Sequence, residues 1–496
     1  MTGIVKRLEF IAQILSSDQI ALTDETNALS YSELIHRVKD ESQWLSGLNV
    51  KVVALHGQNS IDWVILDLAC QEAGIVCVPL PTFFSVDQIE HCLLQAGVDL
   101  ILSDQKNFDT CIDQGFNLSS LEGRSSFHAW RILNANHGEF PSETQKITFT
   151  SGSTGSPKGV CLSAKHQWQV AQSLADVIEI RNPRHLCLLP LSTLLENIAG
   201  VYNPLLCGGC VVLVNDAERG LSGSSGLAMD MLLACIERVQ PETMILIPQL
   251  LTVLVAACEQ GWRPPTFLKF VAVGGAKVSP DLISIAHQYG IPVYQGYGLS
   301  ECGSVVALNT PKEQNVDSVG RVLSHCTVSI ENSEIIVTEP CHLGYLGEPE
   351  SWNPTAVHTG DIGTLEDGWL MIDGRQKNIL ITSFGRNVSP EWVESELMST
   401  PLLSHCMVVG DGKPYLGALV SAPSTITNTD IREWVERVNE RLPDYARVLV
   451  WQRITESSLN KYATPNSRLQ RAHAEKTFKH QIEKFYSADS TLAESY

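Results

Sequence analysis

The 496-residue sequence predicts an α/β protein with a large, multi-layer N-terminal domain and a small α+β C-terminal domain. Three observations support this prediction. Apolar strand-like runs alternate with helical patterns between residues 52 and 273; short strands and Gly/Pro turns follow over residues 328–364; strands and helices mix again beyond residue 377. A chain of this length is also too long for one compact domain.

The expected elements can be placed along the chain by their apolar periodicity. We expect strands at residues 52–55, 75–80, 100–102, 210–214, 244–247, 270–273, 379–382 and 405–409. We expect helices from Trp63 to Cys70 and around residues 88–96, 391–399 and 427–442. The strand–helix–strand rhythm predicts parallel sheets, and hence two α/β subdomains followed by a small β-barrel-like subdomain.

Composition restricts the classes of partner. The formal net charge is −20 and no dense Lys/Arg run is present, so a nucleic-acid partner is not expected. The 14 cysteines are scattered, which favours a reduced, cytoplasmic protein. Cys207 and Cys210 have thioredoxin-like spacing, but the apolar runs around them predict a tight turn into a buried strand. No run is long enough to cross a membrane, and residues 1–17 resemble an amphipathic helix rather than a signal peptide.

The most informative local pattern lies at residues 147–159. A short β run leads into Ser, Thr and Gly residues that end in Pro157, Lys158 and Gly159. Small residues let the backbone curl around an anion, and Lys158 adds a positive charge. Pro157 stands where the Walker pattern needs a glycine, so a P-loop kinase or GTPase is not expected. The alternative is a flexible Ser/Gly linker, but linkers rarely join two apolar runs so closely.

This loop resembles the phosphate loop of the adenylate-forming (AMP-binding) superfamily, which includes acyl-CoA synthetases, luciferases and the adenylation domains of peptide synthetases. Further segments similar to family motifs follow in order at residues 189–196, 294–301, 358–363 and 373–377. Residues 29–34 and 79–81 also fit. The resemblance covers almost the whole chain and is strongest to acyl-CoA synthetases and AMP-dependent acid ligases.

The resemblance implies which residues bind ATP. Its phosphates would be held by Thr150, Ser151, Gly152, Ser153, Thr154, Gly155 and Lys158. The α-phosphate would meet the hydroxyl of Ser300, and Mg²⁺ would be ligated by Glu301. The adenosine would be bound by Gly274, Gly275, Ala276, Gln295, Gly296, Tyr297, Asp361 and Arg375. Tyr297 would stack on the adenine, and Asp361 and Arg375 would bind the ribose.

The resemblance also implies a mobile C-terminal domain. Lys377 falls at the family's hinge, about which the small domain rotates after adenylation. We therefore expect an AMP-binding domain over residues 1–374 and a rotating domain over residues 375–496. Residues 385–390 resemble the segment that approaches the pantetheine channel, so coenzyme A is the expected co-substrate. The sequence carries no signature of an oligomeric state.

Three positions bear on catalysis and substrate choice. Arg468 occupies the place of the family's C-terminal catalytic lysine, and Lys461 is the nearest candidate to replace it. Thr193 stands where many relatives line the acyl tunnel with His or an aromatic residue. Leu191 stands where amino-acid-activating relatives place an aspartate for the substrate ammonium, so an α-amino acid is not expected.

The sequence therefore predicts an ATP- and Mg²⁺-dependent acid–thiol ligase. It would convert a fatty, aryl or other organic acid to an acyl-adenylate, release pyrophosphate and transfer the acyl group to coenzyme A. One alternative delivers the acyl group to a carrier protein or an amine. Another is a non-catalytic nucleotide-binding homologue whose chemistry was lost at Arg468.

Overall fold

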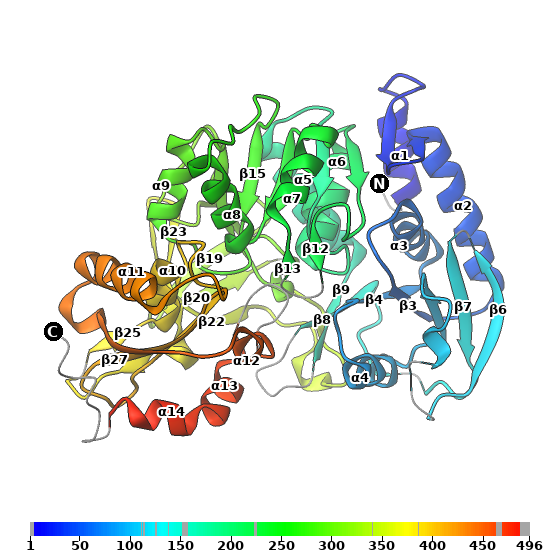
Figure 1. Cartoon of the computed structure of the whole chain (residues 1–496). Helices are drawn as coiled ribbons and strands as arrows, with labels where there is room; N and C mark the ends of the chain where they lie inside the picture. The colour runs from blue at the N-terminus through cyan, green and yellow to red at the C-terminus, as the bar shows by residue number, and fades with distance from the viewer. Residues whose placement is uncertain are drawn as a thin grey trace.

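A computed structural model describes residues 4–110, 112, 115–124, 126–136, 138–150, 157–222, 226–339, 341–384, 386–462 and 469–486. Figure 1 shows a large domain, coloured blue to yellow, and a smaller C-terminal domain, coloured orange to red, at its lower left. The α/β class and the division into a large and a small domain are confirmed.

One large sheet occupies the N-terminal half of the large domain. Its strand order is β21-β9-β8-β4-β3-β5-β7-β6. The strands are β21 (Gly344–Tyr345), β9 (Lys158–Leu162), β8 (Lys146–Thr150), β4 (Val76–Leu80), β3 (Val52–His56), β5 (Leu100–Ser103), β7 (Phe127–Ile132) and β6 (Leu118–Arg124). The parallel strands β4, β3 and β5 are connected through α3 (Ile61–Ala73) and α4 (Val86–Ala96), which confirms the expected rhythm.

Local sequence explains where these connecting helices begin and end. Ser60 and Ser85 cap their first turns through side-chain oxygens, and Gly74 and Gly97 end them in the left-handed conformation. Every residue of β3 and β4 is buried, as in parallel strands covered on both faces.

The second large sheet has 13 strands in the order β19-β20-β22-β23-β18-β17-β16-β15-β14-β10-β11-β1-β2. These are β19 (Thr327–Glu331), β20 (Glu334–Thr338), β22 (Val357–Glu366), β23 (Trp369–Arg375), β18 (Arg321–Val322), β17 (Ala307–Leu308), β16 (Val293–Tyr297), β15 (Phe270–Val273), β14 (Thr243–Leu246), β10 (Arg184–Cys187), β11 (Cys210–Leu213), β1 (Ile20–Thr23) and β2 (Ala28–Ser30). Strands β11, β10, β14, β15 and β16 are parallel and form the second α/β subdomain. The antiparallel strands β17 to β20, β22 and β23 form the small β subdomain, which continues the same sheet.

Helices cover both large sheets. They are α1 (Ile4–Ala12), α2 (Tyr31–Gly47), α5 (Ala164–Ile178), α6 (Asn203–Leu206), α7 (Met229–Val239), α8 (Pro248–Glu259), α9 (Pro280–Gln288) and the π-helix η2 (Glu196–Tyr202). Short connections contain η1 (Phe108–Thr110), η3 (Ser300–Cys302), η4 (Pro349–Ser351), η5 (Gln376–Asn378), and the strand pair β12 (Leu221–Ser222) and β13 (Gly226–Leu227). Within the described residues, no helix is both long and apolar enough to span a bilayer.

The turn predicted between Cys207 and Cys210 is confirmed. Gly208 has a positive φ of 75°, and the chain enters the buried strand β11 at Cys210. The cysteines of the described part are free thiols. Burial raises the pKa of Cys207 to about 11, and it also raises the pKa of Cys210, so neither sulfur is an activated thiolate.

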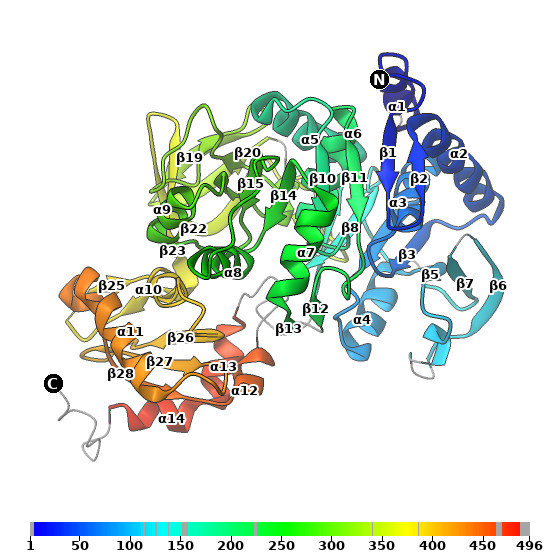
Figure 2. The same ribbon diagram turned by 45° about the horizontal axis from the view of Figure 1, so that its top comes forward.

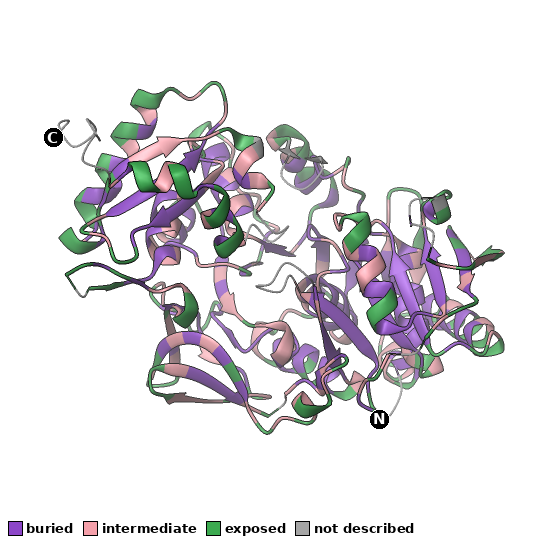
Figure 3. Cartoon of the chain, turned by 90° about the horizontal axis from the view of Figure 1, so that it is seen from below, coloured by how far each residue is buried: buried purple, intermediate pink, exposed green. Residues whose placement is uncertain are grey.

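The small domain has its own three-stranded sheet of β26 (His405–Val409), β27 (Leu416–Ser421) and β28 (Val448–Arg453). One face packs on α10 (Pro390–Leu397) and α11 (Asn428–Arg441), and the other on α12 (Glu456–Asn460), α13 (Arg471–Thr477) and α14 (Lys479–Lys484), as Figure 2 shows. The strand expected at residues 379–382 is the short β24 (Leu380–Ile381), which pairs with β25 (Asn387–Val388), and η6 (Asp444–Ala446) precedes β28. Figure 3 shows the buried strands of both domains beneath partly exposed helices.

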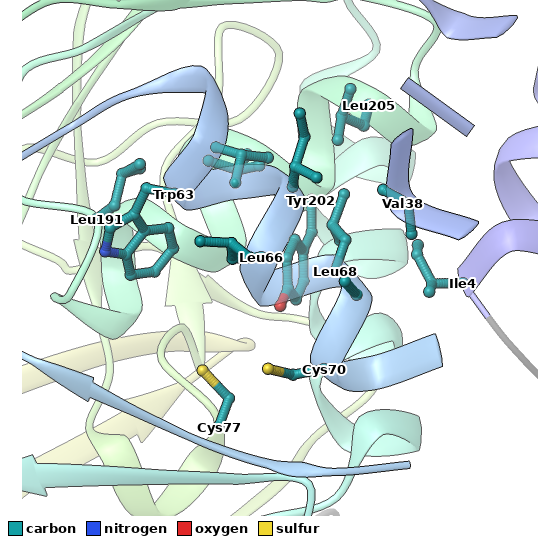
Figure 4. Close-up of a cluster of buried hydrophobic side chains, with 14 of the residues drawn as sticks. Ile4, Val38, Trp63, Leu66, Leu68, Cys70, Cys77, Leu191, Tyr202 and Leu205 are labelled. Carbon is teal, nitrogen blue, oxygen red and sulfur yellow. The ribbon is translucent and has the colours of Figure 1, made fainter. Parts of the chain in front are cut away.

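A hydrophobic cluster, here called the first core cluster, joins α1, α2 and α3 to η2 and α6. A polar network lies inside it, between α3, β8 and η2. Lys146 Nζ lies 2.8 Å from Asp67 Oδ1, and both side chains are 1% exposed. Asp67 Oδ2 also accepts hydrogen bonds from Tyr202, at 2.6 Å, and from Asn197, at 3.0 Å. Tyr202 stands among apolar neighbours from α3 in Figure 4, and its ring stacks on Trp168 at 4.6 Å. The network therefore fixes η2 against the first sheet.

We predict that Lys146→Met destabilises the large domain by about 3–5 kcal/mol, because it leaves Asp67 as a buried charge without its cation. The double variant Asp67→Asn with Lys146→Met removes both charges and should cost clearly less. Urea unfolding followed by tryptophan fluorescence measures both, since Trp168 belongs to the same cluster. Equal losses in the single and double variants would contradict the prediction.

Candidate active site

The described site residues gather around one cavity of about 1760 Å³. It opens at the carboxyl ends of the parallel strands β10, β14, β15 and β16, where open α/β sheets bind ligands. Its wall includes Thr150, Lys158, Thr193, Gly274, Gly275, Ala276, Gln295, Gly296, Tyr297, Ser300, Glu301, Asp361, Arg375 and Lys377. Sequence positions more than 200 residues apart, from Thr150 to Lys377, thus face a common space.

Asp361, Tyr297 and Arg375 form one hydrogen-bonded group. Asp361 accepts from the Tyr297 hydroxyl at 2.7 Å and from Arg375 Nε at 2.9 Å. The register of β22 and β23 sets this geometry, because Asp361 and Arg375 are direct cross-strand partners. Burial, and then the charge of Asp361, raise the pKa of Tyr297 well above its ordinary value, so the phenol remains a donor.

Small residues keep the space above this group open. A Cβ at Gly274 would lie 3.3 Å from the carbonyl oxygen of Gly296, which shows how closely β15 and β16 approach. Gly275 adopts φ +85°, a conformation that side-chain-bearing residues rarely take. At Gly274 and Gly275 the cavity wall is therefore backbone without side chains, which leaves room for a planar ring to approach it closely.

A second group surrounds Glu301. Tyr345 donates its hydroxyl to Glu301 Oε1 at 3.0 Å, and Lys158 Nζ lies 3.5 Å from the centre of the Tyr345 ring. Lys158 also pairs with Glu348 at 2.9 Å. Burial, and then the charge of Glu301, raise the pKa of Tyr345, so its hydroxyl stays protonated and orients the carboxylate.

The pairing of β21 with β9 brings this second group together. Tyr345 pairs with Val160, two residues from Lys158, while Lys158 itself pairs with Thr150 across the mouth of the β8–β9 hairpin. Tyr345 and Glu348 were not predicted from the sequence. Their place depends on a two-residue strand that no local pattern marks.

Lys277 is a further residue that the sequence analysis missed. Its Nζ donates to the backbone carbonyls of Ile372, at 2.9 Å, and Asp373, at 3.2 Å, and it lines the cavity. Burial lowers the pKa of Lys277, which the neighbouring carboxylates partly oppose. The contact ties the loop after β15 to β23, immediately before Arg375.

The donor set fits magnesium and a triphosphate. A carboxylate offers about four acceptor sites, so the bond from Tyr345 leaves Glu301 able to ligate a hard cation. Lys158 and Thr150 stand at the base of the hairpin loop whose small residues predict an anion cradle. Asp361 and Arg375 present an acceptor and a donor to the same cavity that Gly274 lines.

The remaining predicted residues are less central or lie elsewhere. Thr193 is half-buried on the cavity wall, and Lys377 is exposed in η5. Lys461 is exposed at the end of α12 and is not among the described residues that line the cavity. The predictions for Arg468 and for Ser151, Gly152, Ser153, Thr154 and Gly155 lie outside the described residues.

Leu191 does not line the cavity within the described part of the chain. It is 1% exposed, belongs to the first core cluster and lies beside Trp63 in Figure 4. The lack of an aspartate at this position therefore says little about the substrate, and selectivity must come from the residues that do line the cavity.

Family comparison agrees with this site. Residues 12–346 match the family model described as AMP-binding enzyme, and residues 377–490 match the AMP-binding enzyme C-terminal domain. The chain belongs to the AMP-binding enzyme family.

Two curated relatives are similar to this chain in sequence over most of its length. The chain is 26% identical over 473 residues to a feruloyl-CoA synthase of Amycolatopsis sp, covering 87% of this chain and 91% of the relative. It is 25% identical over 480 residues to the 2-succinylbenzoate–CoA ligase of Bacillus subtilis (strain 168), covering 90% and 94%.

Solved structures share the fold over nearly the whole chain. The anthranilate CoA ligase AuaEII in complex with anthranoyl-AMP has a TM-score of 0.81 at 18% identity and covers 97% of this chain and 98% of its own. The B. subtilis o-succinylbenzoate CoA synthetase with ATP and magnesium has a TM-score of 0.73 at 22% identity, covering 95% and 99%. The amide bond synthetase McbA from Marinactinospora thermotolerans has a TM-score of 0.74 at 22% identity, covering 96% and 99%.

We predict that Tyr345→Phe weakens Mg²⁺ binding about 10-fold, because partners that orient a metal-binding carboxylate are worth 10- to 100-fold in affinity. Calorimetric titration of Mg²⁺ into the protein with ATP measures this. Tyr289→Phe is the matched control, since Tyr289 is 41% exposed on α9's end and does not line the cavity. Unchanged half-saturation by Mg²⁺ in Tyr345→Phe would contradict the role given to its hydroxyl.

Proposed function

We propose that the protein is an acid–thiol ligase, which activates a carboxylic acid with ATP and Mg²⁺ and transfers the acyl group to coenzyme A. The observation that carries this proposal is the common cavity of Lys158, Glu301 and the Tyr297–Asp361–Arg375 group. The CoA ligases among the relatives, and the nucleotide complexes of the structural neighbours, support the same assignment.

In the first half-reaction, a carboxylate oxygen attacks the α-phosphorus of ATP and the bond to pyrophosphate breaks. Two anions must approach each other, so positive charge and positioning supply most of the rate. Lys158 and the hairpin loop would hold the phosphates, while Asp361 and Arg375 would fix the ribose. Mg²⁺ at Glu301 would supply charge that neutralises the phosphate oxygens.

In the second half-reaction, a thiolate attacks the carbonyl carbon of the acyl-adenylate and AMP leaves. We propose that residues 375–496 rotate about Lys377 between the two steps. Lys377 is exposed, and Asn387 and Ser389, in the segment that resembles the family's pantetheine-channel segment, line the cavity, which supports this proposal. The boundary after residue 374 follows from the same proposal.

One experiment distinguishes three possible acceptors of the acyl group: coenzyme A, a carrier protein and an amine. Purified protein is given ATP, Mg²⁺ and a panel of aliphatic and aromatic acids, and then coenzyme A, a phosphopantetheinylated carrier protein or an amine. We expect acid-dependent pyrophosphate exchange and an acyl-CoA product. Product formation with an amine alone would favour the chemistry of the amide bond synthetase, whose fold the chain shares. The absence of any acid-dependent exchange would refute the ligase proposal.

We predict that Glu301→Ala lowers pyrophosphate exchange about 100- to 1000-fold, the usual cost of removing one group that stabilises transition-state charge. Little packing is lost, so the unfolding transition should remain near that of the wild type. Glu331→Ala, at an exposed position on β19, is the control and should retain full activity. Full activity in Glu301→Ala would exclude it as the metal ligand.

We also predict that Arg468→Lys raises the rate of the first half-reaction and leaves thiol transfer from a preformed acyl-adenylate unchanged. A lysine donates as a point charge, whereas arginine presents a planar fork. Single-turnover measurements separate the two steps. No gain in Arg468→Lys, together with a large loss in Lys461→Ala, would assign the role to Lys461.

A further inference from the structure

The cavity continues from the nucleotide site along the face of the parallel strands. Strand β14 contributes Thr243, Met244 and Ile245 to its wall, and Ile247 follows; β15 contributes Phe270, Ala272 and Val273, and Gly274 follows. Ile247 is four residue steps from Thr243, and at strand rise these span about 13 Å. The arm is therefore deep and reaches the amino ends of the strands.

Most of this arm is apolar, but its far end is not. His185 is the second residue of β10, and its Nδ1 lies 2.9 Å from Thr243 Oγ1 on the neighbouring strand. Both His185 and Thr243 line the cavity, and they are 2% and 7% exposed. A polar pair at the closed end of an apolar arm needs an explanation, because buried polar groups are costly unless they are satisfied.

Glu196 contacts the ring nitrogen of His185 that faces away from Thr243. Its Oε1 lies 3.0 Å from His185 Nε2, and its Oε2 accepts from the backbone N–H of Leu189 at 3.1 Å. The carboxylate itself is fully buried and does not line the cavity within the described residues. It thus acts on a ligand only through His185.

The backbone of η2 leaves space for the contact between Glu196 and His185. Glu196 is the first residue of the π-helix η2, an irregularity that is frequent at functional sites. A Cβ at Gly200, one turn further on, would lie 2.4 Å from Glu196 Oε1 and 2.7 Å from His185 Nε2. Only glycine leaves room for the pair at this position.

The hydrogen bonds determine which way the Thr243 hydroxyl points. An ionised carboxylate only accepts hydrogen bonds, so Glu196 accepts one from the Leu189 N–H and one from the Nε2–H of His185. When His185 is in the tautomer that donates from Nε2 to Glu196, its Nδ1 is an acceptor and the Thr243 hydroxyl donates to it. The free lone pairs of Thr243 Oγ1 can then accept a hydrogen bond from a ligand.

We propose that the acid substrate carries a neutral hydrogen-bond donor, a hydroxyl or N–H group, at its far end, and that Thr243 reads this group. The inference rests on the proposed function, since it takes the carboxylate to lie at the nucleotide end of the arm. Subtracting one hydrogen-bond length of about 3 Å from the arm places the donor roughly 10 Å from the carboxyl carbon. Glu196 and His185 are positioning residues that set the polarity of Thr243.

Matched acids test this assignment. Pyrophosphate exchange is measured with 4-hydroxycinnamate, 4-methoxycinnamate and cinnamate, and with 8-hydroxyoctanoate against octanoate. The wild type should prefer the hydroxylated member by about 10-fold in kcat/KM, the usual value of a satisfied buried hydrogen bond against an unsatisfied one. Thr243→Val should abolish the preference, so that the hydroxylated and unsubstituted members of each pair are used with similar kcat/KM.

A buried threonine elsewhere provides the control. Thr252 on α8 is 6% exposed, donates to the carbonyl oxygen of Pro248 and does not line the cavity within the described chain. Thr252→Val should keep the wild-type preference. A preference lost equally in both variants would mean general destabilisation and would overturn the role of Thr243.

Glu196→Gln tests the proton relay. The new amide must accept from Leu189 N–H with its oxygen, so its NH₂ donates to His185 Nε2 and moves the imidazole proton to Nδ1. Thr243 then accepts from His185 and donates to the ligand. We expect 4-methoxycinnamate, an acceptor, to become as good as 4-hydroxycinnamate, while cinnamate remains poor. An unchanged hydroxyl-to-methoxy ratio would overturn the relay.

Failure of the inference is distinct from failure of the proposed function. A wild-type protein that activates acids without favouring the hydroxylated member of either pair overturns the inference and leaves the ligase assignment standing. A wild-type protein that shows no exchange with any acid overturns the ligase assignment, and the inference with it.

Discussion

The short pairing between β21 and β9 is the constraint on which the site depends. It fastens the segment after the small β subdomain to the phosphate-loop hairpin of the first sheet. Tyr345 consequently reaches both Glu301, by a hydrogen bond, and Lys158, by its ring face. Glu301 itself follows β16 of the second sheet. The pairing of Gly344 and Tyr345 with β9 therefore holds two predicted site residues together. Glu301, the predicted metal ligand after the second sheet, lies beside Lys158, the predicted phosphate-binding cation of the first.

Under the proposed function, the second sheet would separate recognition of the nucleotide from recognition of the acid along one set of strands. The carboxyl ends present backbone and small side chains, such as Gly274, where a close approach to a planar ligand is needed. The same strands carry larger side chains towards their amino ends, including Phe270 and His185. Because parallel strands project alternate residues to one face, a few substitutions at these positions can change the acid without touching the nucleotide end. This arrangement explains how one fold serves many acids.

Much of the fold could be predicted because apolar periodicity is local. Strand β15 lies at residues 270–273 as expected, and helix α11 differs from its expected span by one residue at each end. Asp361 and Glu301 were also predicted, since each stands in a compact motif, and both line the cavity. Tyr345 and His185 were missed, because their roles arise from partners that are distant in sequence: Glu301 is 44 residues from Tyr345, and Thr243 is 58 from His185. Spacing along the chain carries no information about such contacts until the sheet register is known.

Under the proposed function, electrostatics distinguishes the residues that would keep their contacts from those that would exchange them when a triphosphate binds. The Lys158–Glu348 pair is 40% and 41% exposed, and a pair of this kind is worth only about 0–1 kcal/mol. Lys158 can therefore exchange Glu348 for phosphate at little cost, and Glu348 turns back to solvent. Asp361 is different, because its side chain is 8% exposed and holds two donors from separate strands. Its removal from Arg375 would leave a buried charge unpaired, so the ribose must bind to the group as it stands. The ligand thus adapts to Asp361, whereas Lys158 adapts to the ligand.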